Sequence, residues 1–175
     1  MSEAEFNTLD IVEINRETIK SLKLSAEKAP RDRYRFCLHK SPEHLTNEML
    51  IVANRMAYFR PHRHPTGIDE SYFIIEGNMV VFIFNDLGEV IRIIDMGDYR
   101  SNLTVLYRLC SNLWHLPVPV SEKVVYHEVL TGPFNKEHTV EYALWSPHES
   151  DTDSVSLFMK KLMKTYHQRN RSISK

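Results

Sequence analysis

The stretch "SYFIIEGNMVVFIFNDLGEVIRII" (71–94) constrains the fold of this chain more than any other. It contains three runs rich in β-branched and aromatic residues, separated by "EGN" and by "NDLG", and such runs are typical of strands. Glycine and asparagine allow the backbone conformations that tight turns need. The stretch therefore predicts a meander of three consecutive strands.

Other parts of the chain also have strand character. They cover residues 49–59, 107–120, 122–130 and 139–147. Many short strands with closely spaced turns favour an antiparallel barrel or sandwich. Strands and helices do not alternate in the middle of the chain, which argues against a parallel α/β sheet.

Before this region, the sequence predicts a helix and an extended segment. Asn15 is a typical N-cap residue, and apolar residues then recur at helical spacing until Pro30, which predicts a helix over about 16–28. The following residues 31–40 mix basic and aromatic side chains and could be extended. The "SP" that opens 41–49 predicts one or two helical turns there.

A second helix is predicted near the C-terminus, over about 153–168, with Asp151 or Asp153 as its cap. Its apolar side chains form one stripe, which suits packing on the barrel or a dimer contact. The stripe consists of Val155, Phe158, Met159, Leu162 and Tyr166. The basic end "HQRNRSISK" is expected to fray. The predicted divisions are an N-terminal helical and extended segment that packs on the barrel (1–48), the barrel (49–150), and the C-terminal helix with its basic tail (151–175).

Composition excludes several classes of function. The 175 residues carry a formal net charge of −1, which argues against a general nucleic-acid binder. Cys37 and Cys110 are too few for a disulfide framework or a four-cysteine zinc site. The sequence shows neither a leader pattern nor the apolar run of about 20 residues that a membrane helix needs. We expect a cytoplasmic protein with no nucleic-acid partner and no membrane span.

The candidate metal ligands begin with His62 and His64. Side chains two apart in a strand share a face, and the flanking Pro61 and Pro65 disfavour a helix here. Imidazole binds zinc, iron, copper and nickel, and a carboxylate adds an oxygen donor. The short loop "PTGID" could bring Glu70 back toward the pair. The alternative is that both histidines are solvated loop residues.

Two downstream histidines compete for the fourth ligand position. His115 lies between strands in "NLWHLPVP", and a barrel whose strands return side by side could bring it to the first cluster. His127 lies in "VVYHEVL", where alternation places it and Glu128 on opposite faces. We favour His127 as a core or pocket residue, but the pattern leaves open which of these two side chains faces a pocket.

Two further residues are candidates for contact with a ligand. By alternation, Arg60 shares a face with His62 and His64, so it could bind a carboxylate or phosphate, or it could form a surface ion pair. Tyr72 shares a face with Glu70 and could place its hydroxyl in a pocket or pack as a core aromatic residue. No catalytic residue is assigned.

At these residues the sequence resembles the cupin family. The family's first motif is a histidine pair, a glutamate and a glycine, and here it reads His62, His64, Glu70 and Gly77. His115 would match the histidine of the second motif. In cupins these four side chains bind one divalent metal ion. Five residues separate His64 from Glu70, where the general pattern has three or four, and "CSNLWH" stands where the family has a Pro-x-Gly turn.

Over roughly 26–150 the chain resembles the WbuC-type cupin-fold metalloproteins. The matching segments are "AEKAPRDRYRFCLHKS", "YFRPHRHP", "ESYFIIEGNMVVFIFNDLGEVI", "LWHLPVP", "VVYHEVLTGPF" and "ALWSPHES". The first of these contains Arg33 and His39, which join Arg60, Tyr72 and His127 as candidate substrate-binding residues.

This resemblance implies a mainly β fold: a single cupin domain, a jelly-roll-like barrel or double-stranded β-helix, with N-terminal and C-terminal helices. It also implies one divalent metal ion, which could be Fe, Mn, Ni, Zn or Co. The implied ligand is a carbohydrate-like small molecule, such as an anionic or nucleotide-linked sugar of surface-polysaccharide (O-antigen) biosynthesis. A metal-dependent sugar isomerase or epimerase would suit this context. The alternatives are an iron- or other metal-dependent dioxygenase and a non-catalytic sugar-binding or regulatory cupin. We expect a homodimer.

Overall fold

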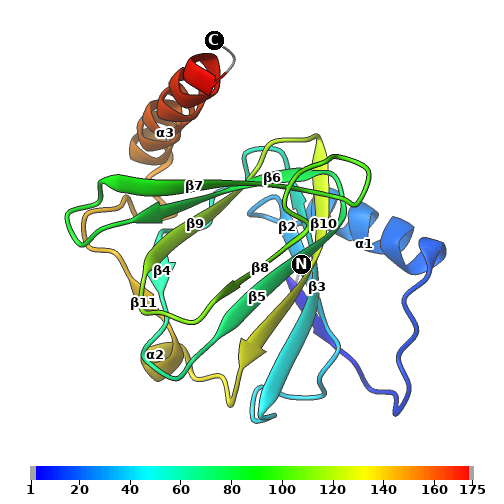
Figure 1. Cartoon of the computed structure of the whole chain (residues 1–175). Helices are drawn as coiled ribbons and strands as arrows, with labels where there is room; N and C mark the ends of the chain where they lie inside the picture. Colours follow the sequence, from blue (N-terminus) through cyan, green and yellow to red (C-terminus); the bar gives the residue numbers. More distant parts are fainter. Residues whose placement is uncertain (1–2, 174–175) are drawn as a thin grey trace.

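The computed structural model describes residues 3–173, which fold into two facing β-sheets with a helix near each end of the chain (Figure 1). The first sheet has six strands in the order β1-β2-β3-β10-β5-β8, and the second has five in the order β11-β4-β9-β6-β7. Strands of the first sheet are β1 (Ala4–Phe6), β2 (Arg33–Cys37), β3 (Thr46–Asn54), β5 (Glu70–Glu76), β8 (Leu106–Leu109) and β10 (Lys123–Thr131). Strands of the second are β4 (His62–Arg63), β6 (Asn78–Phe84), β7 (Val90–Gly97), β9 (Trp114–Pro119) and β11 (Glu141–Tyr142).

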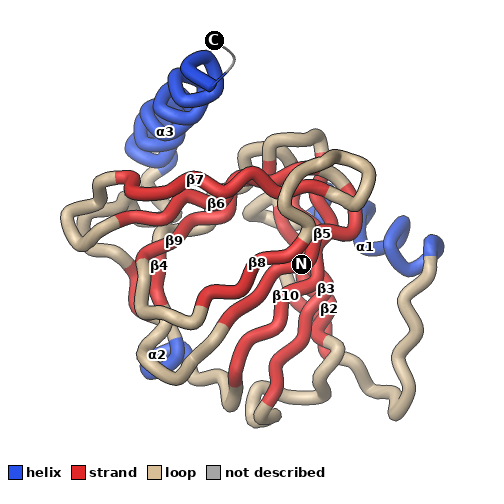
Figure 2. Tube along the Cα trace, in the orientation of Figure 1, coloured by secondary structure: helices blue, strands red, loops and turns tan. Residues whose placement is uncertain are grey.

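The main hydrophobic core lies between the two sheets. Ile51, Tyr72 and Ile74 of the six-stranded sheet and Phe82 and Leu116 of the five-stranded sheet are almost fully buried in one cluster. Except for the short parallel pair of β1 and β2, all paired strands are antiparallel. The predicted mainly β, jelly-roll-like barrel with terminal helices is therefore confirmed (Figure 2).

The predicted three-stranded meander is only partly right. β6 and β7 form the expected hairpin, but β5 pairs with β8 and β10 in the other sheet. The chain changes sheets at Gly77, whose φ is +83°. A Cβ there would lie 2.3 Å from the backbone oxygen of Lys123, so only glycine fits this bend. The "EGN" signal located a turn, but the turn joins two facing sheets rather than two neighbouring strands.

Helix α1 (Arg16–Lys28) has the predicted bounds, and the side chain of Asn15 accepts a hydrogen bond from the backbone N–H of Thr18 at 3.0 Å. Leu22 and Ala26 pack on the outer face of the six-stranded sheet, against residues of β3 and β10 (Figure 1). The extended segment within 31–40 is confirmed as β2.

The helical turns expected within 41–49 are absent. Residues 41–45 form bends and a turn, and β3 begins at Thr46. β3 pairs with both β2 and β10, and this pairing outweighs the local helix signal. The segment 1–48 thus supplies β1, β2 and the first residues of β3 to the larger sheet.

The region after β10 also differs from the expectation of one extended piece over 139–147. It contains a short helix, α2 (Lys136–Thr139), and then only the two residues of β11. β11 pairs with β4, which carries His62. This edge pairing places the segment beside the histidine strand.

Helix α3 (Thr152–Ile173) is longer than predicted. The side chain of Asp151 accepts a hydrogen bond from the N–H of Ser154 at 3.1 Å, so Asp151 is the cap. The predicted apolar stripe packs against the barrel's own core, with Met159 and Leu162 buried. The basic stretch does not fray before Ile173, because Arg169 donates to the backbone oxygen of Ile93 and pairs with Asp95 on β7. Residues 174–175 lie outside the described part.

Within residues 3–173, no helix combines the length and apolar character required to cross a membrane.

Candidate metal centre

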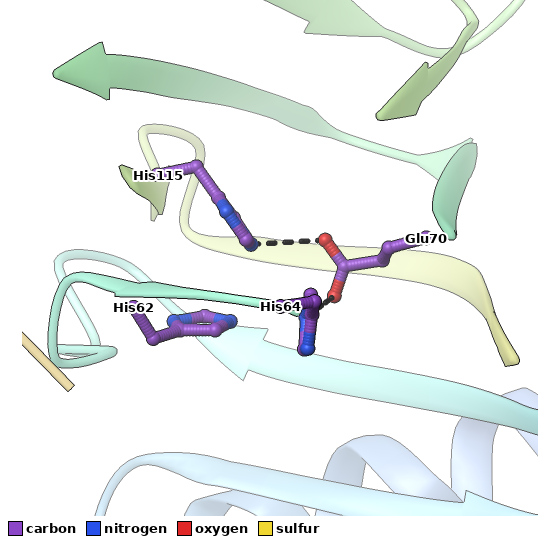
Figure 3. Close-up of side chains that lie close together, drawn as sticks. All are labelled: His62, His64, Glu70 and His115. Carbon is purple, nitrogen blue, oxygen red and sulfur yellow. Dashed lines mark hydrogen bonds and ion pairs between the residues drawn. The ribbon is translucent and has the colours of Figure 1, made fainter. Parts of the chain in front are cut away.

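The fold brings four sequence-predicted ligands together from both sheets. His62 lies on β4 directly opposite His115 on β9, and Glu70 opens β5 in the other sheet. His64 follows β4. One ligand atom from each residue lies within 4.8 Å of the others, and the side chains point toward one another (Figure 3). Between His115 and His127, the structure therefore brings His115 to the cluster.

A backbone carbonyl holds each imidazole in place. The Nδ1 atoms of His62, His64 and His115 lie 3.0, 2.7 and 3.1 Å from the backbone oxygens of Arg60, Thr139 and Leu113. A carbonyl oxygen only accepts hydrogen bonds, so each Nδ1 carries the proton. Each Nε2 is then available as a lone-pair donor. This is how proteins commonly orient metal-binding histidines.

The carboxylate of Glu70 faces two of these Nε2 atoms. Its oxygens lie 3.3 Å from Nε2 of His64 and 3.0 Å from Nε2 of His115 (Figure 3). A carboxylate and an unprotonated Nε2 are both acceptors, so a positive charge is needed between them, supplied by a proton or a metal ion. Among the described residues, Nε2 of His115 and Oε2 of Glu70 have no well-aligned hydrogen-bond partner. The donor set and these unpartnered buried atoms fit a metal ion.

The pKa shifts agree with this arrangement. Burial would raise the pKa of Glu70, but His115 and His64 lower it well below its ordinary value. Burial would lower the pKa of His64, but Glu70 raises it above the ordinary value. Burial, together with His115, lowers the pKa of His62 well below its ordinary value. The cluster thus keeps its carboxylate charged and His62 neutral, as metal binding requires.

A cavity of about 320 Å³ opens beside the cluster, and His62, His64 and Glu70 form part of its wall. This volume lies at the lower end of the range for small-molecule sites. Four of the five predicted substrate-binding residues also line it. These are Arg33, His39, Arg60 and Tyr72.

The fifth, His127, faces the other way. It is partly exposed on the outer face of the sheet, with Nε2 3.8 Å from a carboxylate oxygen of Glu48, and does not line the cavity. The interpretation of His127 as a core or pocket residue is therefore wrong. By alternation along β10, Glu128 faces inward and lines the cavity.

The arginine candidates differ in how their charges are used. Arg33 is buried, lies 2.8 Å from a carboxylate oxygen of Glu149, and donates to the backbone oxygen of Tyr58. Arg60 donates only to neutral groups, at 3.2 Å to the hydroxyl of Ser146 and at 2.9 Å to the backbone oxygen of Ala143. Arg60 therefore keeps more of its positive charge available to the cavity.

The other two candidates are buried. Nδ1 of His39 accepts a hydrogen bond from the backbone N–H of Glu48 at 3.1 Å, and burial lowers the pKa of His39. Tyr72 makes edge-to-face contacts with Tyr107 and Tyr126, and burial raises its pKa well above the ordinary value. Its hydroxyl thus stays protonated at neutral pH.

Sequence reasoning missed Arg35 as a cavity residue and left open whether Glu128 or His127 faces the cavity. Glu128 pairs across the sheet with Met49 and Tyr72, and burial, then Glu70, raises its pKa to about 8. Within residues 3–173 it has neither a hydrogen-bond partner nor an ion-pair partner. Side-chain alternation could have identified Arg35, because it lies two residues from Arg33 and therefore on the same face of the strand.

Comparison with known proteins gives a match to a family model and similar solved structures. The model described as "Domain of unknown function (DUF6016)" matches residues 14–96. No curated protein matches the chain.

Three solved structures illustrate the structural similarity. A protein from Shewanella oneidensis shares 11% identity over 57% of this chain and 63% of its own, with a TM-score of 0.47. Oxalate decarboxylase from Bacillus subtilis shares 20% identity over 57% of this chain and 24% of its own length, with a TM-score of 0.45. The Cupin_2 domain of an XRE family transcriptional regulator from Enterobacter cloacae shares 17% identity over 58% of this chain and 98% of its own length, also with a TM-score of 0.45. The chain thus spans less than two thirds of the first two proteins.

These TM-scores are low, so the class rests on this chain's own architecture. Two facing sheets enclose a core and a cavity, and three histidines and one glutamate converge at the cavity wall. Together they define a two-sheet, jelly-roll-like β-barrel with a cluster that could hold a metal ion.

Proposed function

We propose that this protein binds one divalent metal ion through His62, His64, Glu70 and His115 and acts on a carbohydrate-like small molecule in the adjoining cavity. The orientation of the imidazoles carries this proposal. Backbone carbonyls hold all three Nδ1 atoms, which leaves all three Nε2 atoms to converge with one carboxylate. The cavity of about 320 Å³ offers room for a small ligand beside them.

A divalent ion at this position would polarise a hydroxyl or carbonyl oxygen of a bound ligand as a Lewis acid. Glu128 can hold or release a proton near neutral pH, because its pKa is raised to about 8. The hydroxyl of Tyr72 remains a hydrogen-bond donor. These groups suit proton transfer at a carbon next to a polarised carbonyl, which is the chemistry of a sugar isomerase or epimerase.

The finer part of the proposal is a WbuC-type role in surface-polysaccharide (O-antigen) biosynthesis. It is supported by the resemblance of "YFRPHRHP" and of the later segments "LWHLPVP", "VVYHEVLTGPF" and "ALWSPHES" to WbuC-type proteins. The cytoplasmic location and the homodimer stay predictions. Fe, Mn, Ni, Zn and Co are all compatible with a three-histidine, one-glutamate donor set.

Elemental analysis of the purified protein tests the metal site. We expect about one equivalent of a divalent metal per chain, and its loss from the alanine variants of the four ligands. His127→Ala is the matched control and should retain the metal, because His127 lies on the outer face of the sheet. Retention of stoichiometric metal by all four ligand variants would overturn the assignment.

A panel of free sugars, sugar phosphates and nucleotide-linked sugars tests the ligand. Metal-loaded and chelator-treated protein should differ in binding or conversion, followed by NMR. Oxygen uptake that depends on a ligand would favour the dioxygenase instead. Metal-dependent binding without turnover under any of the five metals would favour the non-catalytic function.

A further inference from the structure

One wall of the cavity is built from alternate residues of a single segment. Side chains two apart along β2 share a face, and every second residue from 31 to 39 lines the cavity. They are Arg31, Arg33, Arg35, Cys37 and His39. Arg33 and Arg35 therefore stand on the cavity side of β2, and Arg31 lines the cavity from the turn before this strand.

Acidic partners neutralise two of the three. Arg31 pairs with Glu3 and Glu149, and Arg33 pairs with Glu149 at 2.8 Å. Arg33 also lies over the ring of Phe59, 4.4 Å from its centroid. Through these ion pairs, the two guanidinium groups connect Glu3 near the N-terminus and Glu149 before α3 to the barrel.

Arg35 has no such partner. Among the described residues its guanidinium forms neither a hydrogen bond nor an ion pair, although Arg35 is partly buried and lines the cavity. The charge of Arg35 acts through space on Glu3 and Glu128, but Glu3 pairs with Arg31, and neither carboxylate forms an ion pair with Arg35 among the described residues. The guanidinium of Arg35 therefore lines the cavity without an ion-pair partner, with five donor hydrogens for a ligand.

The rest of the cavity wall adds to this positive charge. Arg60, on another part of the wall, donates only to neutral acceptors. Lys136 is exposed beside the cavity. The cavity lining within residues 3–173 contains five arginine or lysine residues and three glutamates, and Glu70 and Glu149 are already engaged by cationic or imidazole groups. An anionic ligand would balance the charge that remains.

The strand order separates Arg35 from the metal cluster. β2 and β5 are three strand spacings apart, through β3 and β10, which is about 14 Å between their backbones. The long side chain of Arg35 and the inward-pointing Glu70 shorten the gap between their charged groups. A molecule of a few carbon atoms could then contact both ends.

We propose that Arg35 is the anion-binding residue of this cavity. Its ligand is a small anionic molecule whose carboxylate or phosphate lies on the guanidinium of Arg35, while a hydroxyl or carbonyl oxygen reaches the cluster of His62, His64, Glu70 and His115. This inference rests on the proposed function and narrows its ligand class to acidic or phosphorylated sugars. Arginine suits this role because its planar donors match both oxyanions.

Calorimetric titration of zinc-loaded protein with three probes tests the inference. The probes are glucose, glucuronate and glucose 6-phosphate, which share a sugar ring and differ in the anionic group. We expect the wild type to bind at least one anionic probe about tenfold or more tightly than glucose. Arg35→Gln, which keeps a polar side chain but loses the charge, should abolish this preference. The exposed Arg92 on β7 provides the control variant Arg92→Gln, which should behave as the wild type.

The outcomes separate this inference from the proposed function. Unchanged zinc content in Arg35→Gln, with the anion preference lost, supports both. A preference that depends on Arg35 but persists in zinc-free protein supports the anion site and counts against the metal's role in ligand binding. The inference is overturned if Arg35→Gln keeps the preference, or if the wild type shows none for either anion. Preference for glucuronate or for glucose 6-phosphate identifies the group as carboxylate or phosphate.

Discussion

Replacing His115 with alanine should abolish most of the stabilisation that zinc confers on this protein. His115 is fully buried, and its Nε2 lies 3.0 Å from the carboxylate of Glu70. Its ring is fixed by the backbone oxygen of Leu113. The substitution removes one of four converging donors and leaves the others in place.

The size of the effect follows from binding linkage. At free zinc about 100-fold above Kd, binding to the native state alone stabilises the wild type by about 2.7 kcal/mol. For a chain of this length, about 1 kcal/mol moves Tm by roughly 2–4 °C, so zinc should raise Tm by about 5–11 °C. Losing groups that merely orient a ligand weakens metal binding by about 10–100-fold, and losing a donor should reach at least the upper figure. At the same zinc concentration the variant then gains only about 0.4 kcal/mol, or about 1 °C.

Differential scanning calorimetry with and without zinc measures this difference within each variant. The cost of the cavity that alanine leaves lowers Tm in both conditions and so cancels from the zinc-induced shift. His127→Ala, a histidine loss on the outer face of the sheet, should keep the wild-type shift. A full zinc-induced shift in His115→Ala would refute the four-ligand site, and loss of the shift in His127→Ala would show that zinc acts elsewhere.

Four further results are expected. Between pH 4.5, its ordinary pKa, and about pH 8, its pKa in the folded protein, Glu128 is protonated only in the folded state. The free energy of unfolding of the metal-free protein should therefore fall by about 2 kcal/mol as the pH rises through this range. A pKa raised from 4.5 to about 8 would correspond to nearly 5 kcal/mol, but water in the cavity reduces this free energy. Urea unfolding of Glu128→Gln should show a flatter pH profile. A thiol reagent should modify exposed Cys110 at least tenfold faster than Cys37, whose pKa burial raises to about 11; equal rates would contradict this. Arg33→Met should cost about 1.5–3 kcal/mol in urea unfolding because it removes the buried, charged hydrogen bond to Glu149, which then keeps only Arg31; an unchanged midpoint would argue against that pair. Leu162→Ala should cost about 2–5 kcal/mol, whereas an exposed α3 without core contacts would show almost no loss.

Features that depend on near neighbours could be predicted from the sequence. The start of α1 depends on Asn15 and the N–H of Thr18, three residues away, and both ends were predicted. The spacing of His62 and His64 placed them on one face, because side chains alternate along an extended chain. The strand character of 71–94 was correct for the same reason, since it reflects which side chains suit an extended backbone.

Pairing partners could not be predicted in this way. "EGN" indicates a turn, but only the packing of Gly77 against the backbone of Lys123 shows that the turn leads into the opposite sheet. "SP" favours helical turns after residue 41, but pairing of β3 with strands on both sides extends the chain from Thr46.

The inside of the barrel was the other feature that the sequence left open. Alternation places His127 and Glu128 on opposite faces of the strand but does not indicate which face is buried. The buried face is the one that the second sheet covers, and that depends on the tertiary structure. The strand order then placed Glu128 in the cavity and His115 opposite His62. The sequence by itself determined α1, the beginning of α3, most of the strand-forming segments and three of the four converging ligands. Only the tertiary structure decided the fourth ligand and the free arginine of the cavity, since both depend on contacts between residues far apart in the chain.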